Sequence, residues 1–126
     1  MKAFRLLEQL EQMGITTITG VPDSTLKQFC DGIQTYKGNL RHYVTVNEGA
    51  AVGMAIGSYL ATSRPACVYM QNSGIGNAVN PLASLANRDV YGIPMLFIVG
   101  WRGEPGIKDE PQHVFQGKIT CELFDT

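Results

Sequence analysis

Glu48 is the residue whose type and position most clearly allow chemistry. It stands alone between an apolar, strand-like segment, residues 44–46, and a run of small residues that extends to Gly57. A helix of small residues packs closely against its neighbours, so we expect its first turn to be buried. A buried carboxylate is costly unless a partner bonds to it. Two interpretations stay open: an acid stabilised by the free N–H groups at a helix start, or a catalytic group that binds a partner.

The glycines that follow Glu48 favour the second interpretation. Gly49, Gly53 and Gly57 lie within the same predicted helix, and each glycine costs a helix about 1 kcal/mol relative to alanine. A helix that tolerates three of them makes room for a close neighbour, which is either another helix or a ligand.

Asp23 and His113 are two further candidate functional residues. Asp23, followed by Ser24, stands after a Gly-Val-Pro sequence and is either a helix cap or a functional group. His113 is either a capping residue or an acid/base group, because imidazole titrates near neutral pH.

Two further polar segments could contact a ligand. Residues 72–77, Asn-Ser-Gly-Ile-Gly-Asn, lack the lysine of a phosphate-binding loop, so they favour a plain strand-to-helix turn while leaving backbone contacts to a ligand open. Arg102 and Lys108, within residues 100–112, would suit an anionic substrate, although exposed loop charges are by default solvated. The sequence contains no Gly-x-Ser-x-Gly elbow and no cluster of metal ligands.

The elements that position these residues alternate between helix and strand. Apolar periodicity with start and stop signals predicts helices over residues 3–13, 23–33, 47–62, 78–87 and 113–124. Apolar and β-branched runs predict strands over residues 15–19, 41–46, 66–71 and 94–99, with the last in the buried centre of a sheet. The pattern predicts an α/β fold, a three-layer sandwich with a mainly parallel sheet between helices, whose loops at the carboxyl ends of the strands meet at one edge.

Composition is that of an ordinary globular domain. The 126 residues are 44% hydrophobic and carry a formal net charge of −1, which gives no electrostatic reason to bind nucleic acid or an anionic membrane. No apolar run approaches the length of a membrane span, and the first residues lack the apolar core of a signal peptide. Three widely spaced cysteines, Cys30, Cys67 and Cys121, are expected to be reduced thiols. We expect a cytoplasmic protein without nucleic-acid or membrane partners.

The polar segments, taken in order, resemble the pyrimidine-binding domain of thiamine-diphosphate-dependent decarboxylases. The resemblance is carried by Gly-Val-Pro-Asp-Ser at 20–24, Val-Asn-Glu-Gly-Ala-Ala at 46–51, Asn-Ser-Gly-Ile-Gly-Asn at 72–77 and the segment 100–113. It covers nearly the whole chain, residues 1–126, as one domain. The last segment favours family members that act on 3-phosphonopyruvate, with those that act on sulfopyruvate as near relatives.

The resemblance implies a role for each candidate residue. Glu48 would bond the aminopyrimidine ring of thiamine diphosphate and help the cofactor to lose the proton of its reactive carbon. Asp23 and His113 would assist proton transfers at that carbon. Two further sets complete the implied site: the lining of the pyrimidine pocket, Asn72, Ser73, Gly74 and Gly76, and the groups that bind the substrate anions, Ser24, Arg102 and Lys108.

The resemblance also implies that this chain holds only part of a site. Family members bind Mg²⁺ and the diphosphate on a second domain, through a Gly-Asp-Gly segment that this sequence lacks. We therefore expect no metal ligands here, a partner domain or subunit that binds diphosphate, and a homo-oligomer. The expected reaction converts 3-phosphonopyruvate to phosphonoacetaldehyde and carbon dioxide. A subunit acting on sulfopyruvate or another 2-oxo acid, and a non-catalytic assembly module of the same fold, stay open as alternatives.

Overall fold

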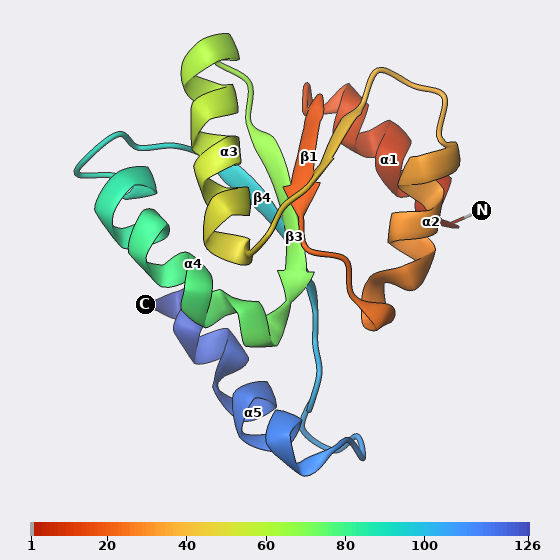
Figure 1. Cartoon of the computed structure of the whole chain (residues 1–126), viewed down its shortest axis with the longest axis vertical. Helices are drawn as coiled ribbons and strands as arrows, with labels where there is room; N and C mark the ends of the chain where they lie inside the picture. Colours follow the sequence, from red (N-terminus) through yellow and green to blue (C-terminus); the bar gives the residue numbers. More distant parts are fainter. Residues whose placement is uncertain (1) are drawn as a thin grey trace.

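The computed structural model describes residues 2–126, which form three layers around a parallel β-sheet (Figure 1). Within this range the sheet has four strands in the order β2-β1-β3-β4, and all neighbouring strands are parallel. Their bounds are Thr17–Gly20 for β1, Arg41–Val44 for β2, Ala66–Gln71 for β3 and Met95–Gly100 for β4. One face is covered by α1 (Lys2–Gln12) and α2 (Lys27–Thr35), and the other by α3 (Glu48–Thr62) and α4 (Ile75–Pro81). The predicted three-layer α/β fold is confirmed.

Strand β3 forms the centre of the sheet and divides the core into two halves. Successive side chains of a strand point to opposite faces, so Val68 and Met70 pack with α3 and α4, whereas Cys67 and Tyr69 pack with α1 and α2. All four side chains are fully buried. Strand β4 lies at the edge of the sheet, and most of its side chains are half-buried.

The prediction that residues 94–99 form the centre of the sheet was therefore wrong. An apolar run indicates that both faces of a strand are covered, but it does not indicate how many neighbouring strands pair with that strand. Strand β3, whose apolar run is just as continuous, takes the central position in the described residues.

The segment 72–77 is helical and does not form the predicted turn. A single 3₁₀ turn, η2 (Asn72–Gly74), leads directly into α4, which begins at Ile75. The backbone of Gly74 has a φ of −79°, a value that any residue can adopt. The need for glycine at this position is therefore explained by close packing and not by a turn. The helical segment continues beyond Pro81 as a short π-helix, η3 (Leu82–Ala86).

The other predicted elements agree with the structure to within a few residues. Gly14 ends α1 with a φ of +79°, as expected for a glycine that follows a helix. The helix predicted after Asp23 is divided into a 3₁₀ turn, η1 (Ser24–Leu26), and α2. The last helix, α5 (Pro111–Asp125), begins two residues earlier than predicted, because Pro111 occupies a first-turn position that proline favours.

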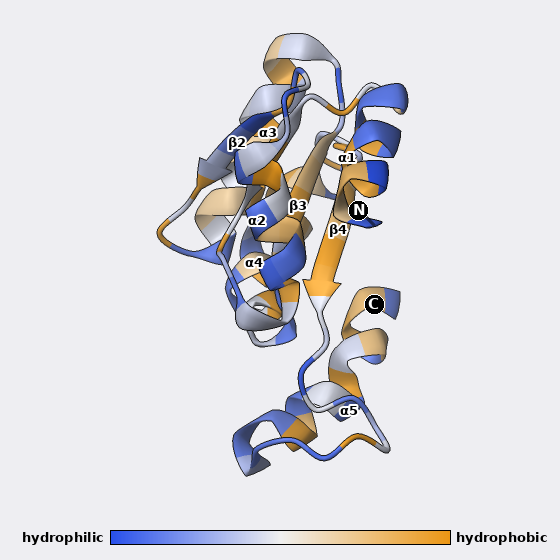
Figure 2. Ribbon diagram, turned by 90° about the vertical axis from the view of Figure 1, so that its right-hand side faces the viewer, coloured by the Kyte–Doolittle hydropathy of each residue, from blue (hydrophilic) through white to orange (hydrophobic). Residues whose placement is uncertain are grey.

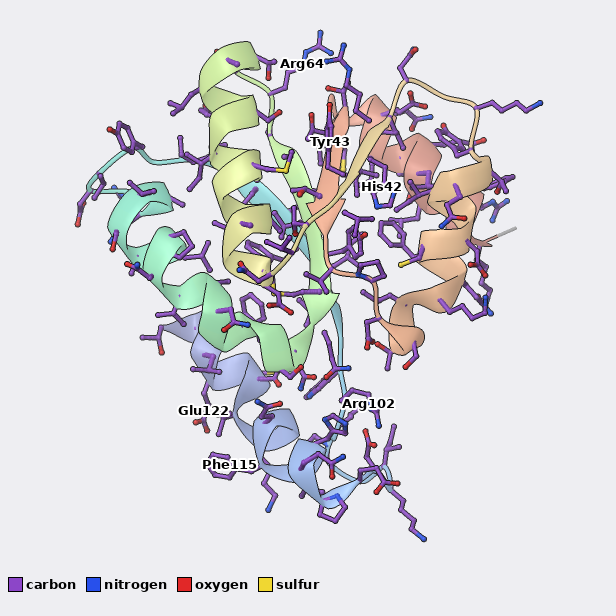
Figure 3. All side chains as sticks on the ribbon, viewed as in Figure 1. His42, Tyr43, Arg64, Arg102, Phe115 and Glu122 are labelled. Atoms are coloured by element: carbon purple, nitrogen blue, oxygen red, sulfur yellow. The ribbon has the colours of Figure 1, made fainter. Side chains whose placement is uncertain are left out.

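Helix α5 begins beyond the carboxyl end of β4 and runs back toward α4 (Figure 1 and Figure 2). Near its end, the ring centroid of Phe124 lies 5.8 Å from that of Phe97 on β4. The helix is also attached through Gly117, which packs against the backbone of Gly103, and through the indole of Trp101, whose Nε1–H donates to the carbonyl of Gly117 at 2.9 Å. Phe115 and Glu122 point outward from this helix (Figure 3). No helix within residues 2–126 has the length and apolar character needed to cross a membrane.

Gly20, at the end of β1, is required by the packing of Tyr69 against its backbone. A Cβ at position 20 would lie 2.6 Å from Cδ1 and 2.7 Å from Cγ of the Tyr69 ring. We expect Gly20→Ala to lower the free energy of unfolding by about 2 kcal/mol or more, because overpacking a core costs roughly 1–3 kcal/mol. Chemical denaturation measures this loss.

Gly57→Ala is the matched control, because nothing lies within 4 Å of a Cβ at position 57. Alanine is the better helix former by about 1 kcal/mol, so we expect this variant to keep or gain stability. Equal losses in both variants would contradict the packing explanation.

Candidate active site

Glu48 is the first residue of α3 and lies at the carboxyl edge of the sheet. The helix is capped by its neighbour: the side-chain oxygen of Asn47 accepts a hydrogen bond from the backbone N–H of Ala50 at 2.8 Å. The Glu48 carboxylate instead accepts, through Oε2, a hydrogen bond from Nδ2 of Asn77 on α4 at 2.8 Å. Its second oxygen, Oε1, accepts no hydrogen bond from residues 2–126. The carboxylate is therefore oriented by one contact and keeps a free acceptor.

Two glycines allow α3 to approach η2 and α4 beside Glu48. A Cβ on Gly74 would collide with the carboxyl group of Glu48, and a Cβ on Gly49 would lie 2.8 Å from the carbonyl oxygen of Asn77. The sequence predicts a close neighbour for these small residues, either a helix or a ligand. At Gly49 this neighbour is a helix, α4.

The first turn of α3 is more exposed than predicted. Residues 48–50 are half-buried, and the fully buried positions begin at Ala51. The prediction of a buried first turn was wrong, because η2 and α4 cover this turn while its other side lies open at the edge of the sheet. Gly53 and Gly57 face open space as well.

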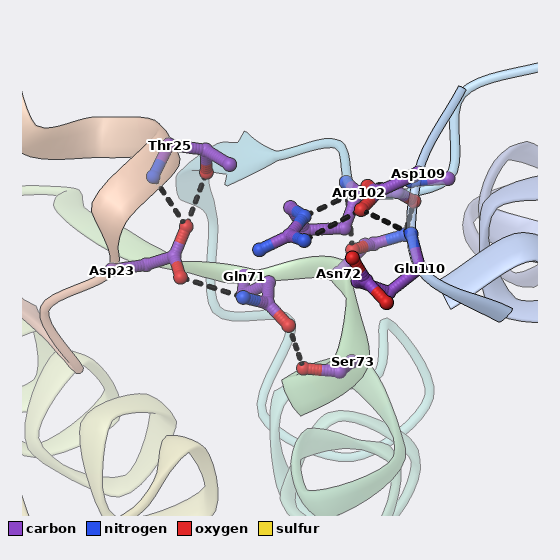
Figure 4. Close-up of polar contacts among 9 residues, drawn as sticks. Asp23, Thr25, Gln71, Asn72, Ser73, Arg102, Asp109 and Glu110 are labelled. Atoms are coloured by element: carbon purple, nitrogen blue, oxygen red, sulfur yellow. Dashed lines mark hydrogen bonds and ion pairs between the residues drawn. The ribbon is translucent and has the colours of Figure 1, made fainter. Parts of the chain in front are cut away.

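Asp23 is held by donors from two elements (Figure 4). Its Oδ1 accepts hydrogen bonds from the backbone N–H of Thr25 at 2.9 Å and from the Thr25 hydroxyl, and its Oδ2 accepts one from Nε2 of Gln71 at 2.6 Å. Burial raises the pKa of this carboxyl, but the hydrogen bonds from Thr25, Gln71 and the backbone of Ser24 together lower it below its ordinary value. Asp23 thus caps η1 and also reaches the end of β3.

Asn72 is buried, and its side chain is used within the chain. Its Nδ2 donates to the carbonyl of Arg102 at 2.8 Å and to Oγ1 of Thr120 at 2.9 Å, and its Oδ1 accepts from the backbone N–H of Arg102 at 3.1 Å. The amide joins η2 to the segment after β4 and to α5. Because the side chain of Asn72 is bonded within the chain, the predicted contact of this residue with a cofactor would have to come from its backbone.

Arg102 forms a two-point ion pair with Asp109. Its Nε donates to Oδ2 at 2.8 Å and its Nη2 to Oδ1 at 2.5 Å, while the backbone N–H groups of Gly103 and Glu110 also donate to this carboxylate. The guanidinium, followed by these backbone donors, holds the pKa of Asp109 far below its ordinary value. The charge of Arg102 is therefore already balanced, and its guanidinium has a fixed orientation.

The remaining predicted site residues lie on separate elements. Ser24 begins η1 and is exposed, and Lys108 is exposed in the loop before α5. His113 lies half-buried in the first turn of α5, where its backbone N–H donates to the carbonyl of Glu110 at 2.9 Å. Gly76 is exposed on α4, with nothing within 4 Å of a Cβ position.

The comparison that decides the family covers almost the whole chain. Residues 3–123 match the profile of the family described as thiamine pyrophosphate enzyme, N-terminal TPP binding domain. The chain belongs to this family. Thiamine pyrophosphate and thiamine diphosphate are two names for the same cofactor, so the resemblance seen in the sequence is confirmed.

Relatives of this thiamine pyrophosphate enzyme domain include decarboxylases. Phosphonopyruvate decarboxylase of Streptomyces hygroscopicus is 40% identical over 119 residues, which are 94% of this chain and 29% of that protein. Sulfopyruvate decarboxylase subunit alpha of Methanococcus maripaludis is 34% identical over 113 residues, which are 90% of this chain and 65% of that subunit. The thiamine diphosphate-dependent 4-hydroxybenzoylformate decarboxylase of Rhodococcus jostii RHA1 superimposes with a TM-score of 0.64 and 27% identity, over 88% of this chain and 21% of that one. The chain thus spans less than a third of the phosphonopyruvate decarboxylases it resembles.

Three polar residues of this thiamine pyrophosphate enzyme domain were missed from the sequence. Gln71 bonds Asp23, Asn77 bonds Glu48, and Asp109 bonds Arg102. One feature of the sequence could have indicated Gln71: it is a polar residue at the end of an otherwise apolar strand. The other two pairings depend on loop and helix geometry that sequence spacing does not give.

The Arg102–Asp109 pair makes stability depend on pH. Because the pKa of Asp109 is lowered on folding, the stability it contributes is present above the ordinary aspartate value of 3.8 and is lost as pH falls from there toward the lower folded value. We expect Asp109→Asn to lower the melting temperature by several degrees at neutral pH. The difference from the wild type should shrink once the pH falls below about 4.

Asp31→Asn is the control for this experiment. The Lys27–Asp31 pair is also short, at 2.6 Å, but its side chains are 74% and 59% exposed, and exposed pairs contribute little. We expect Asp31→Asn to change the melting temperature only slightly at every pH. A loss in Asp109→Asn that does not vary with pH would show that the ion pair is not its cause.

Proposed function

We propose that this chain supplies the pyrimidine-binding half of a thiamine-diphosphate-dependent decarboxylase of 2-oxo acids. The observation that supports this most directly is the placement of Glu48: one carboxylate oxygen is held by Asn77, and the other is free beside Gly74. Ligands of parallel α/β sheets bind at the carboxyl edge of the strands, where this carboxylate lies.

The residues around Glu48 fit an aminopyrimidine ring. A free carboxylate oxygen is an acceptor that suits an N–H donor of the ring. Gly74 provides the space in which the Glu48 side chain lies, since a Cβ there would collide with the carboxyl group. When bound, thiamine diphosphate supplies the nucleophilic carbon and accepts the electrons released on decarboxylation.

The chain's own residues would hold the cofactor and move protons. Glu48 would accept the hydrogen bond from the pyrimidine ring and exchange a proton with it. Asp23, whose pKa is lowered by its hydrogen bonds, would present an ionised carboxylate at the reacting carbon, and His113 would serve as a second acid/base group. We place Mg²⁺ and the diphosphate on a complementary domain or subunit, and we propose a homo-oligomeric assembly.

We propose 3-phosphonopyruvate as the substrate and phosphonoacetaldehyde and carbon dioxide as the products. Identity supports this choice, at 40% to two phosphonopyruvate decarboxylases against 34% to the sulfopyruvate decarboxylase subunit of M. maripaludis. Arg102, Ser24 and Lys108 would bind the substrate anions, with the guanidinium oriented by Asp109. Sulfopyruvate is the second candidate, because a sulfonate offers similar anionic oxygens. Decarboxylation rates on the two acids, measured with the same assembled enzyme, distinguish them.

Glu48→Gln tests the proposed function. The substitution keeps the size of the side chain and removes its ability to exchange a proton, so we expect decarboxylation by the assembled enzyme to fall about 100-fold or more. The free energy of unfolding should change by less than about 0.5 kcal/mol, because the Asn77 contact can persist. Steady-state kinetics and denaturation measure the two effects.

Glu122→Gln provides the same change of chemistry at an exposed position on the outer side of α5 (Figure 3). It should leave turnover unchanged. Near-normal turnover in Glu48→Gln would refute the assignment of Glu48 and the function built on it.

A further inference from the structure

Gln71 connects two parts of the candidate site that are distant in the sequence. It is the last residue of β3, and its side chain contacts Asp23, which follows β1, and Ser73 in η2 (Figure 4). We propose that Gln71 is a positioning residue of the decarboxylation site, whose amide fixes the carboxylate of Asp23 and joins it to Ser73. This inference rests on the proposed function, because Gln71 acts through Asp23.

The hydrogen-bonding capacity of each group sets the direction of this chain of contacts. An ionised carboxylate only accepts hydrogen bonds, so the amide must turn its nitrogen toward Asp23, where Nε2 lies 2.6 Å from Oδ2. The amide oxygen then faces Ser73, whose hydroxyl donates to Oε1 at 2.6 Å. A single orientation of the Gln71 amide satisfies both neighbours.

The strand ends hold this arrangement in place. Gln71 pairs with Gly100 in the register of β3 and β4. A Cβ on Gly100 would lie 3.1 Å from Oδ1 of Asp23 and would collide with the Thr25 hydroxyl. Glycine at this position therefore lets the Asp23 cap lie over the end of β4, within reach of Gln71.

Gln71 lies on a different element from the other donors to Asp23. Thr25 and Ser24 belong to the same cap as Asp23 and hold the carboxylate locally. Gln71 comes from the central strand and bonds Oδ2, the oxygen opposite the cap. Two titratable groups face this carboxylate from other elements: Cys30 on α2, and Arg102, which is already paired with Asp109.

Removing this donor should change the chemistry of Asp23 as well as its mobility. A hydrogen bond to a charged group is lost in Gln71→Leu, so we expect the pKa of Asp23 to rise by about one unit. Gln71→Glu keeps the length of the side chain and places a second carboxylate beside Asp23, so it should raise that pKa further. Ser73→Ala frees the amide oxygen and should produce a smaller rise in the same direction.

The experiment measures the pKa of Asp23 directly. The chain has five aspartates, so carboxyl ¹³C resonances of the full chain, labelled at aspartate, can be titrated and the Asp23 signal assigned by its loss in Asp23→Asn. Melting temperatures of each variant show whether the fold is kept. If Gln71→Leu does not fold, Gln71→Glu and the exposed Ser73→Ala decide the outcome.

The measurements distinguish a positioning role of Gln71 from a role in stability alone. A rise of the Asp23 pKa, with a matching shift of the acidic limb of the kcat profile to higher pH in the assembled enzyme, supports the proposal. Variants that melt earlier with an unchanged Asp23 pKa, or an altered pKa with an unmoved kcat profile, would overturn it. A wild-type assembled enzyme that decarboxylates no 2-oxo acid would refute the proposed function itself, whatever the pKa measurements give.

Discussion

The close approach of α3 to η2 and α4 determines where the candidate catalytic acid lies. Gly74 leaves room for the Glu48 carboxyl group, and Gly49 lets the helix start lie against the carbonyl of Asn77. The amide of Asn77 then holds one carboxylate oxygen. Because Asn47 already caps α3, Glu48 is not needed to start the helix, and its free oxygen can serve a ligand. Side chains at either glycine would separate the two helices or displace the carboxylate.

Two groups of polar contacts link the strand ends at the same edge of the sheet. Asp23 joins β1 to β3 through Gln71, and Asn72 joins η2 to the segment after β4. Asp109 in turn fixes the guanidinium of Arg102. Asn72, which is buried, thus has partners in the segment after β4 and in α5, and a buried polar group whose hydrogen bonds are all satisfied makes its surroundings rigid. A chain that provides half of a composite site would present its groups in fixed positions in this way.

Sequence reasoning recovered the elements whose signals are local. The apolar run of β3, the glycine after α1 and the acid that starts α3 each reflect neighbours along the chain. What it missed depends on partners that the fold supplies. The sequence favours a turn for the glycines in 72–77, whereas Gly74 leaves room for the Glu48 carboxyl group. An apolar run also could not show that β4 lies at an edge of the sheet. The pairing of Arg102 with Asp109 requires the loop between them to fold back, with Gly103 at a φ of +67°.

The most direct test of the role of Glu48 is a structure of the assembled enzyme with thiamine diphosphate bound. We predict that Oε1 of Glu48 lies within hydrogen-bond distance of a pyrimidine ring nitrogen, about 2.7–3.2 Å, while Oε2 keeps its contact with Asn77. A pyrimidine ring bound away from this carboxylate, with both of its oxygens remote from the cofactor, would contradict the assignment.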